Sequence, residues 1–104
     1  MSAAVPEPQE VLAATVRVPE HVVHRDFEGE TVALNLHTGT YHGLNPTAAR
    51  MLEVLGDGGT VADELPALCD EFGQPRDVIE RDVVALCRAL AERDLIELDH
   101  AGRG

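Results

Sequence analysis

The chain has 104 residues, a length that suits one compact domain rather than two. Hydrophobic residues make up 44% of it, and aromatic residues only 3%, so aliphatic side chains must fill the core. Nineteen acidic residues against eight arginines and no lysine give a formal net charge of −11. A field this negative opposes binding to nucleic acid, and it suits solubility or a basic protein partner.

No apolar run approaches the roughly 18–20 residues that cross a bilayer, and no basic segment followed by a hydrophobic stretch opens the chain. We therefore expect a cytoplasmic protein with no membrane partner. The two cysteines, Cys69 and Cys87, stand among leucines on predicted helix faces and lack a C-x-x-C spacing. Their pattern indicates buried thiols.

The N-terminal part of the chain divides into a tail and a first hairpin. Residues 1–15 contain prolines and small side chains without a sustained period, so we expect a flexible tail. A first strand is predicted to contain Val22 and Val23 and to reach Phe27. Residues 28–30, Glu-Gly-Glu, are typical of a hairpin turn.

A second and a third strand follow. Residues 31–36 alternate between apolar and other side chains, which predicts a strand whose buried face carries Val32, Leu34 and Leu36. Gly39 can adopt a positive φ in the turn that comes next. Residues 40–44 then run back beside the second strand. The order 1-2-3 leaves this third strand on an edge of the sheet.

The first predicted helix begins at Asn45-Pro46, because an Asn side chain caps free amides and proline suits the first helical position. Its apolar face recurs at helical spacing and consists of Ala48, Met51, Leu52 and Leu55. The glycine-rich segment 56–59 ends it. The first helix is therefore short.

Two more helices are predicted. Thr60 and Asp63 have the spacing of a capping box that opens the second helix, but Pro66 should remove a hydrogen bond and kink that helix or delay its start. Pro75 opens the third helix, whose apolar stripe is Ile79, Val83, Leu86 and Leu90. A short extended end follows, and residues 99–104 are expected to be a flexible tail.

Strands followed by helices, without internal repeats, indicate an α+β domain with helices on one face of an antiparallel sheet. We predict a winged-helix-like domain over residues 16–98, with a three-stranded sheet followed by three helices.

Catalytic and metal-binding patterns are not found in the sequence. His21 and His24 would point to opposite faces of a strand, and no third ligand at a familiar spacing accompanies His37 and His42. Ser2 is the only serine, and both cysteines are expected to be buried. We therefore expect no enzyme activity, no metal and no cofactor.

The third strand offers a different function. Its edge exposes unpaired backbone groups with few protecting charges, so an extended peptide can pair with it as an added strand. The alternative is an edge too short to matter. The peptide-binding residues expected on this strand are Thr40, Tyr41, His42, Gly43 and Leu44.

The third helix supplies a possible second wall for a peptide groove. One flank beside its apolar stripe contains Val78, Asp82, Ala85 and Ala89, and the opposite flank contains Val84, Cys87 and Ala91. Periodicity does not choose between them, although we favour Val78, Asp82 and Ala85. Arg81 and Arg88 lie farther round the helix. We also expect Arg81 to contact acidic groups of a peptide.

The segment TGTYHGLNPTAARML, residues 38–52, resembles the centre of PqqD-like proteins, the recognition elements of ribosomally made and modified peptides. Further similar positions are residues 59–60, Asp82-Val83-x-x-Leu86, and the sequence RDLI at 93–96. The resemblance covers about residues 16–98. Within the superfamily, the pattern T-G-x-Y-x-G-L-N-P-T in a free-standing chain is most similar to the discrete leader-binding proteins of lasso-peptide pathways.

This resemblance implies a non-catalytic protein that binds a precursor's leader as an added strand between the third strand and the third helix. It implies as partners the leader itself, a leader peptidase of transglutaminase-like cysteine-protease type, and the ATP-dependent macrolactam synthetase. Two positions depart from the family. Asp94 stands where glycine is common and accepts a left-handed φ less readily, and Pro66 makes the second helix atypical.

Two other functions compete with leader presentation to a peptidase. A PqqD-like chaperone would deliver its peptide to a radical enzyme instead. A winged-helix DNA-binding regulator would share the helix arrangement, but its recognition helix should be net basic. Residues 75–93 carry four arginines against four acids, so this helix is neutral.

Overall fold

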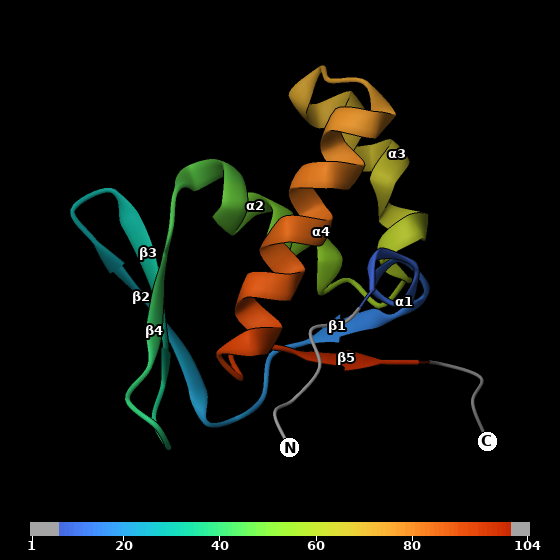
Figure 1. Ribbon diagram of the computed structural model, residues 1–104. Helices are drawn as coiled ribbons and strands as arrows, with labels where there is room; N and C mark the ends of the chain where they lie inside the picture. The colour runs from blue at the N-terminus through green and yellow to red at the C-terminus, as the bar shows by residue number, and fades with distance from the viewer. Residues whose placement is uncertain (1–6, 101–104) are drawn as a thin grey trace.

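The computed structural model describes residues 7–100 as a mixed α+β domain (Figure 1). A three-stranded antiparallel sheet, in the order β2-β3-β4, carries helices on one face, and a two-stranded sheet of β1 and β5 lies beside them. The predicted fold class is thereby confirmed. The elements in chain order are α1 (Pro8–Ala13), β1 (Thr15–Arg17), β2 (Val22–Phe27), β3 (Glu30–Asn35), β4 (Tyr41–Leu44), α2 (Pro46–Leu55), α3 (Val61–Phe72), α4 (Arg76–Glu92) and β5 (Glu97–Asp99).

The β2-β3 hairpin forms where the sequence predicts it. Its register runs from Val22 opposite Asn35 to Phe27 opposite Glu30. Glu28 and Gly29 have φ values of 50° and 84°. Two successive positive φ values are typical of the tight turn that matches the right-handed twist of paired strands.

The buried face of β3 differs from the predicted one. Ala33 and Asn35 are 1% and 0% exposed, whereas Leu36 is 59% exposed. Val32 and Leu34 are half-buried on the outer side of the sheet. The prediction that these three apolar residues face the core is therefore wrong. Alternation fixes which residues share a face, but small inward side chains are what let the helices approach the sheet here.

Two predicted helices begin at their predicted caps, and the third begins directly after Pro75. The Ala48 amide donates to Asn45 Oδ1 at 2.8 Å at the start of α2. At the start of α3, Thr60 and Asp63 exchange hydrogen bonds of 3.1 and 3.2 Å between each side chain and the other's amide. Pro66 lies inside α3, yet the helix starts at Val61, so the proline does not delay it.

The expectation of a flexible tail over residues 1–15 is wrong for its second half, whereas residues 1–6 lie outside the described part of the chain. Residues 8–13 form α1, in which Val11 is 0% exposed and packs into the core. The amide of Val61 donates to the Ala14 carbonyl at 2.8 Å, which ties this segment to α3. The core therefore includes residues that precede the predicted domain boundary at residue 16.

The C-terminal extended segment pairs with β1. Thr15, Val16 and Arg17 lie opposite Asp99, Leu98 and Glu97 in an antiparallel register. Arg17 also makes an ion pair with Glu97. Asp99 is thus part of a strand rather than of the predicted C-terminal tail, and residues 101–104 lie outside the described range.

Candidate functional site

The free edge of β4 is the first component of the site. The amide of Asn35 donates to the Thr40 carbonyl at 2.9 Å, which fixes the phase of the β3-β4 ladder. Because hydrogen-bonded and non-hydrogen-bonded pairs alternate in an antiparallel ladder, His42 and Leu44 point their backbone groups toward β3. Tyr41 and Gly43 therefore direct their N–H and C=O groups toward the free edge.

The opposite edge of the sheet, β2, is the competing place for an added strand. It carries exposed charged or polar side chains at His24, Arg25 and Asp26. The β4 edge carries Tyr41 and Gly43 instead. Charged side chains protect an edge from pairing, so β4 is the edge open to an incoming strand.

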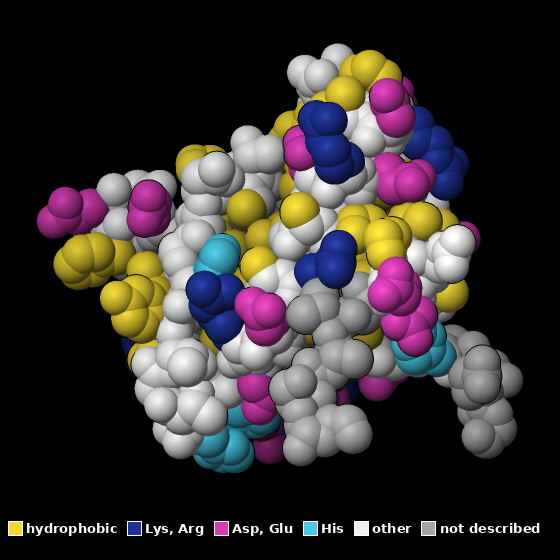
Figure 2. Space-filling view, in the orientation of Figure 1, with side chains coloured by type: hydrophobic (Ala, Val, Ile, Leu, Met, Phe, Trp, Pro, Cys, Tyr) yellow, Lys and Arg dark blue, Asp and Glu magenta, His cyan; other side chains and the backbone are white. Residues whose placement is uncertain are grey.

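The second component is the wall that α4 and the first turns of α2 form beside β4. One hollow, of about 420 Å³, is lined by Thr47, Met51, Phe72, Gln74, Val78, Ile79 and Asp82. A second, of about 260 Å³, is lined by Asn45, Thr47, Ala48, Met51, Asp82, Ala85 and Leu86. The hollows share three residues and therefore form one continuous depression, which we call the α2/α4 hollow. Hydrophobic side chains reach the surface between the sheet and α4 (Figure 2).

The two flanks of α4 have different surroundings. Val78, Asp82 and Ala85 line the α2/α4 hollow. Val84 and Cys87, on the other flank, are 7% and 0% exposed and belong to the hydrophobic core. Burial raises the pKa of the Cys87 thiol to about 12, so this sulfur stays protonated and unreactive near neutral pH.

Hydrogen bonds join β4 and α4 where β4 starts and α4 ends, away from the α2/α4 hollow. The fully buried side chain of Asn35 donates through Nδ2 to the Asp94 carbonyl at 2.9 Å. Its Oδ1 accepts from the amides of His37 and Thr38 at 2.8 and 3.1 Å. The Thr40 hydroxyl donates to the Arg93 carbonyl at 3.2 Å. These contacts, which we call the Asn35 clamp, hold the start of β4 against the end of α4.

At the end of α4, Asp94 occupies the left-handed position at which the sequence resemblance led us to expect glycine. Asp94 has a φ of 58°. The Leu95 amide donates to the Leu90 carbonyl at 2.8 Å, and the Asp94 amide donates to the Ala91 carbonyl at 3.0 Å. This pair of bonds defines a Schellman motif, which normally places glycine at the left-handed position.

The predicted site residues fall into distinct places. Thr40 belongs to the Asn35 clamp, Tyr41 and Gly43 lie on the edge of β4, and the half-buried His42 points to the inner face of the sheet. Leu44 is 1% exposed in the core, so its side chain is not available to a peptide.

Arg81 is not brought to the α2/α4 hollow. It lines a separate hollow of about 560 Å³ with Pro8, Val84 and Arg88 among others. Its guanidinium lies 3.8 Å from the Asp82 carboxylate, and both side chains are more than half exposed. An exposed pair of this kind contributes at most about 1 kcal/mol. The sequence reasoning about this site did not name the other eight lining residues, which are Asn45, Thr47, Ala48, Met51, Phe72, Gln74, Ile79 and Leu86.

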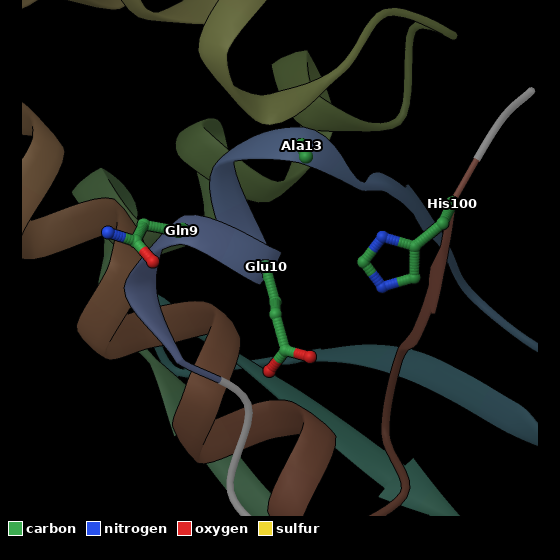
Figure 3. A pocket seen from close by; sticks show the side chains of 4 residues that line it. All are labelled: Gln9, Glu10, Ala13 and His100. Carbon is green, nitrogen blue, oxygen red and sulfur yellow. The ribbon is translucent and has the colours of Figure 1, made fainter.

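Another hollow lies elsewhere, between α1 and the end of β5. It measures about 610 Å³ and is lined by Gln9, Glu10, Ala13 and His100 (Figure 3). Glu10 and His100 approach it from different elements, and the Glu10 carboxylate already accepts the Glu7 amide at 2.8 Å. This hollow is lined from α1 and from the residue that follows β5, and it therefore lies apart from the three-stranded sheet that carries the β4 edge.

Titratable groups outside the site have structural roles. Arg50 lies 2.7 Å from both Glu71 and Glu53. The hydrogen bond to Arg50 lowers the pKa of Glu71, and the same bond raises the pKa of Arg50. His21 stacks on His37 with ring centroids 4.2 Å apart. Within residues 7–100, no three His, Cys, Asp or Glu side chains are grouped so as to hold a metal ion.

An exposed β-strand edge beside a hollow between two helices is an arrangement with which small α+β domains can bind extended peptides. A family model described as "Coenzyme PQQ synthesis protein D (PqqD)" matches residues 30–96. The chain belongs to the PqqD family. The resemblance to PqqD-like recognition elements, inferred from residues 38–52, is thereby confirmed.

Two solved structures resemble the chain. One is TbiB1 in complex with the TbiA(beta) leader peptide, at 33% identity and a TM-score of 0.67, covering 85% of this chain and 98% of that one. The other is a lasso peptide synthetase B1 complexed with the leader peptide, at 31% identity and a TM-score of 0.71, covering 81% and 99%. The search of curated proteins finds no match. In the described part of the chain, every helix is too short or too polar to cross a membrane.

Proposed function

We propose that this chain binds the leader of a ribosomally made precursor, a lasso-peptide precursor, as an added strand on β4. The observation that carries the proposal is the free edge at Tyr41 and Gly43 beside the α2/α4 hollow. Backbone pairing supplies the affinity, and side-chain pockets beside it supply the choice of sequence. Two similar structures, at 33% and 31% identity, hold leader peptides, which supports this reading.

In this role the chain contributes recognition and leaves the chemistry to its partners. Binding orders a disordered leader and raises the effective concentration of its cleavage site near the leader peptidase. The peptidase, of transglutaminase-like cysteine-protease type, and the macrolactam synthetase are the proposed protein partners, in the cytoplasm.

Calorimetry with the leader of the precursor encoded in the same gene cluster tests this function. We expect saturable binding at or below micromolar concentration for the wild type and its loss in Val78→Asp. Val78 lies half-buried in the first turn of α4, where an acidic residue is favourable to the helix, so the variant should remain folded.

Ala67→Asp is the matched control for Val78→Asp. It adds the same charge to an exposed position of α3 and should bind the leader like the wild type. Failure of the wild type to bind would contradict the proposed function. Unchanged binding by Val78→Asp, with native circular dichroism, would move the peptide away from the α2/α4 hollow.

The family match favours a second candidate, in which the same groove delivers its peptide to a radical enzyme. Both candidates predict leader binding, so calorimetry does not separate them. A cleavage assay does. Acceleration of leader removal by the peptidase of the same gene cluster supports the first, and its absence alongside tight leader binding supports the second.

A further inference from the structure

A hollow between α4 and the start of α1 contains three of the chain's eight arginines. It measures about 560 Å³, and we call it the arginine hollow. Its lining combines apolar with cationic side chains, namely Pro8, Val84 and Ala85 with Arg76, Arg81 and Arg88. Because the chain has no lysine, the dark-blue side chains over α4 in Figure 2 are arginines, and hydrophobic side chains lie next to them.

The arginine hollow is cationic in a strongly acidic chain. Three arginines and two acidic residues line it, whereas the whole chain has a net charge of −11. Two of the arginines have acidic neighbours on α4 itself. The guanidinium of Arg76 lies 3.6 Å from the Glu80 carboxylate, and that of Arg81 lies 3.8 Å from the Asp82 carboxylate. Arg88 is the third arginine, and its surroundings differ.

Arg88 is half-buried, and its Nε atom is buried without a hydrogen-bond partner among residues 7–100. None of the ion pairs found among these residues involves Arg88. All 19 acidic residues of the sequence lie within residues 7–100, so no acidic side chain outside this range can be its partner. A buried donor without an acceptor is unfavourable, and a carboxylate is the acceptor that matches a guanidinium best. Arg88 is therefore suited to a carboxylate from another molecule.

The arginine hollow adjoins the groove proposed for the leader. Ala85 lines both the arginine hollow and the α2/α4 hollow. Its side chain is small and exposed, so it places no barrier between the two hollows. A peptide seated beside β4 can therefore extend a side chain across α4 into the arginine hollow.

The net charge of the chain favours a carboxylate that a bound peptide carries over a free anion. A charge of −11 opposes the approach of an anion from solution. A leader that β4 already holds presents its side chains at a high effective concentration, and the nearby guanidinium then outweighs the more distant acids. The apolar lining of the hollow accommodates the aliphatic part of an acidic side chain.

We propose that the arginine hollow binds the carboxylate of one aspartate or glutamate of the leader through Arg88, with Arg81 as a second cation. This inference rests on the proposed function. Backbone pairing along β4 depends little on the sequence of the added strand, whereas Arg88 selects for an acidic residue at one position of the leader. The hollow is thus a specificity determinant beside the groove.

The test combines variants of the chain with variants of the leader in calorimetry. In the leader of the precursor encoded in the same gene cluster, each Asp is changed to Asn and each Glu to Gln, one at a time. We expect one of these changes to weaken binding about tenfold, and Arg88→Gln to weaken it by a similar factor. The two changes together should weaken binding little more than either alone, because both remove the same contact. Since Arg88 is half-buried, salt should screen this contact only weakly.

Arg25→Gln is the matched control, because it removes the same charge from an exposed position of β2 and should change leader affinity by less than about twofold. Arg88→Lys keeps the charge without the planar guanidinium, so it should recover only part of the affinity. Arg81→Gln, at an exposed position, should weaken binding about two- to threefold. Urea denaturation verifies that each variant folds, and Arg81→Gln together with the leader series keeps the test decisive if Arg88→Gln does not.

Absence of leader binding by the wild type defeats the proposed function itself. Saturable leader binding that neither the Arg88 variants nor any acid-to-amide change weakens defeats only the carboxylate site. Additive losses in the combined change defeat it too, since they show that Arg88 and the leader's acid do not touch. Equal losses in Arg88→Gln and Arg25→Gln would assign the effect to net charge and overturn the proposal.

Discussion

Gly43 allows the strand-addition hypothesis to be tested at a single backbone amide. Its N–H points to the free edge rather than toward β3, so proline should remove a bond to the leader without breaking the β3-β4 ladder. We expect Gly43→Pro to weaken leader binding about five- to tenfold, the net value of one hydrogen bond near 1 kcal/mol. Calorimetry measures it.

Gly43→Ala is the control, because it retains the N–H group. A Cβ at this position would meet only the Glu30 carboxylate, at 3.4 Å. If the alanine and proline variants bind the leader equally, the leader does not pair with the backbone of β4.

Asn35 is the buried polar residue of the described core, and its clamp should dominate the stability of the groove. Asn35→Ala leaves the Asp94 carbonyl and the amides of His37 and Thr38 without their partners. We expect the free energy of unfolding to fall by about 2–4 kcal/mol, measured by urea denaturation. Thr40→Ala, which removes one exposed hydrogen bond of the same clamp, should cost about 1 kcal/mol or less. Equal losses in the two variants would contradict the central role of Asn35.

The residues that could be predicted from the sequence are those whose interactions involve neighbours along the chain. Asn45 was predicted as a cap because its signal lies in four consecutive residues. Asn35 was not identified, because its partners are Asp94, in a turn distant along the chain, and its own turn. Hydrogen bonds between segments that are distant along the chain produce no periodic pattern in the sequence. The same limit applies to Thr47 and Met51, which become lining residues only when α4 packs beside α2.

At the scale of elements, the buried Cys87 on α4 should make the free energy of unfolding decrease at alkaline pH. Burial raises the pKa of Cys87 to about 12, above the ordinary value of a thiol. Below the unfolded pKa, near 8.5, both states are protonated and the contribution is fully present. As pH rises above that value, only the unfolded thiol ionises, so the free energy of unfolding should fall by up to about 1.4 kcal/mol per pH unit until the folded pKa is reached.

Urea denaturation between pH 8 and pH 11 measures this slope, and Cys87→Ala should remove the thiol's share of it. Cys69 is present in both proteins and cancels in the comparison. The slopes are compared rather than the absolute stabilities, since truncating a buried side chain is itself destabilising. Identical slopes would show that Cys87 ionises as readily in the fold as in the unfolded chain.

Helices were predicted well because caps and apolar stripes are local, as α2, α3 and α4 illustrate. The helix α1 was missed. It has only six residues, too few for a periodic pattern, and Val11 is its one fully buried side chain. Tertiary packing stabilises such a short helix, and propensity alone does not. The prediction of the buried face of β3 was wrong for a related reason. Alternation in the sequence defines two faces of a strand, and only the packing of the helices decides which of them is buried.

At the scale of the whole molecule, the order of strands and helices was enough to predict an α+β domain. The pairing of β1 with β5 was not predicted, because Thr15 and Asp99 stand at opposite ends of the chain. This pairing makes residues 15–17 and 97–99 part of the fold. The sequence placed the groove between β4 and α4 through the family resemblance, while the edge strand alone left the question open.

The net charge of −11 separates the two proposed interactions by their response to salt. In the proposed function, leader binding depends on backbone pairing at β4 and on the α2/α4 hollow, which polar and apolar side chains line together and in which Asp82 is the charged residue. Raising salt from about 0.1 M to about 1 M shortens the Debye length from about 10 Å to about 3 Å. Leader affinity should therefore change by less than about threefold, since short-range contacts are little screened.

We expect peptidase binding to respond differently, because a chain this acidic associates fastest with a basic surface. We expect its association rate to fall at least about tenfold over the same salt range while its dissociation rate changes little, as screening acts mainly on the encounter. Surface plasmon resonance at several salt concentrations separates the two rates. Salt-independent association would show that contacts other than the global charge bring the two proteins together.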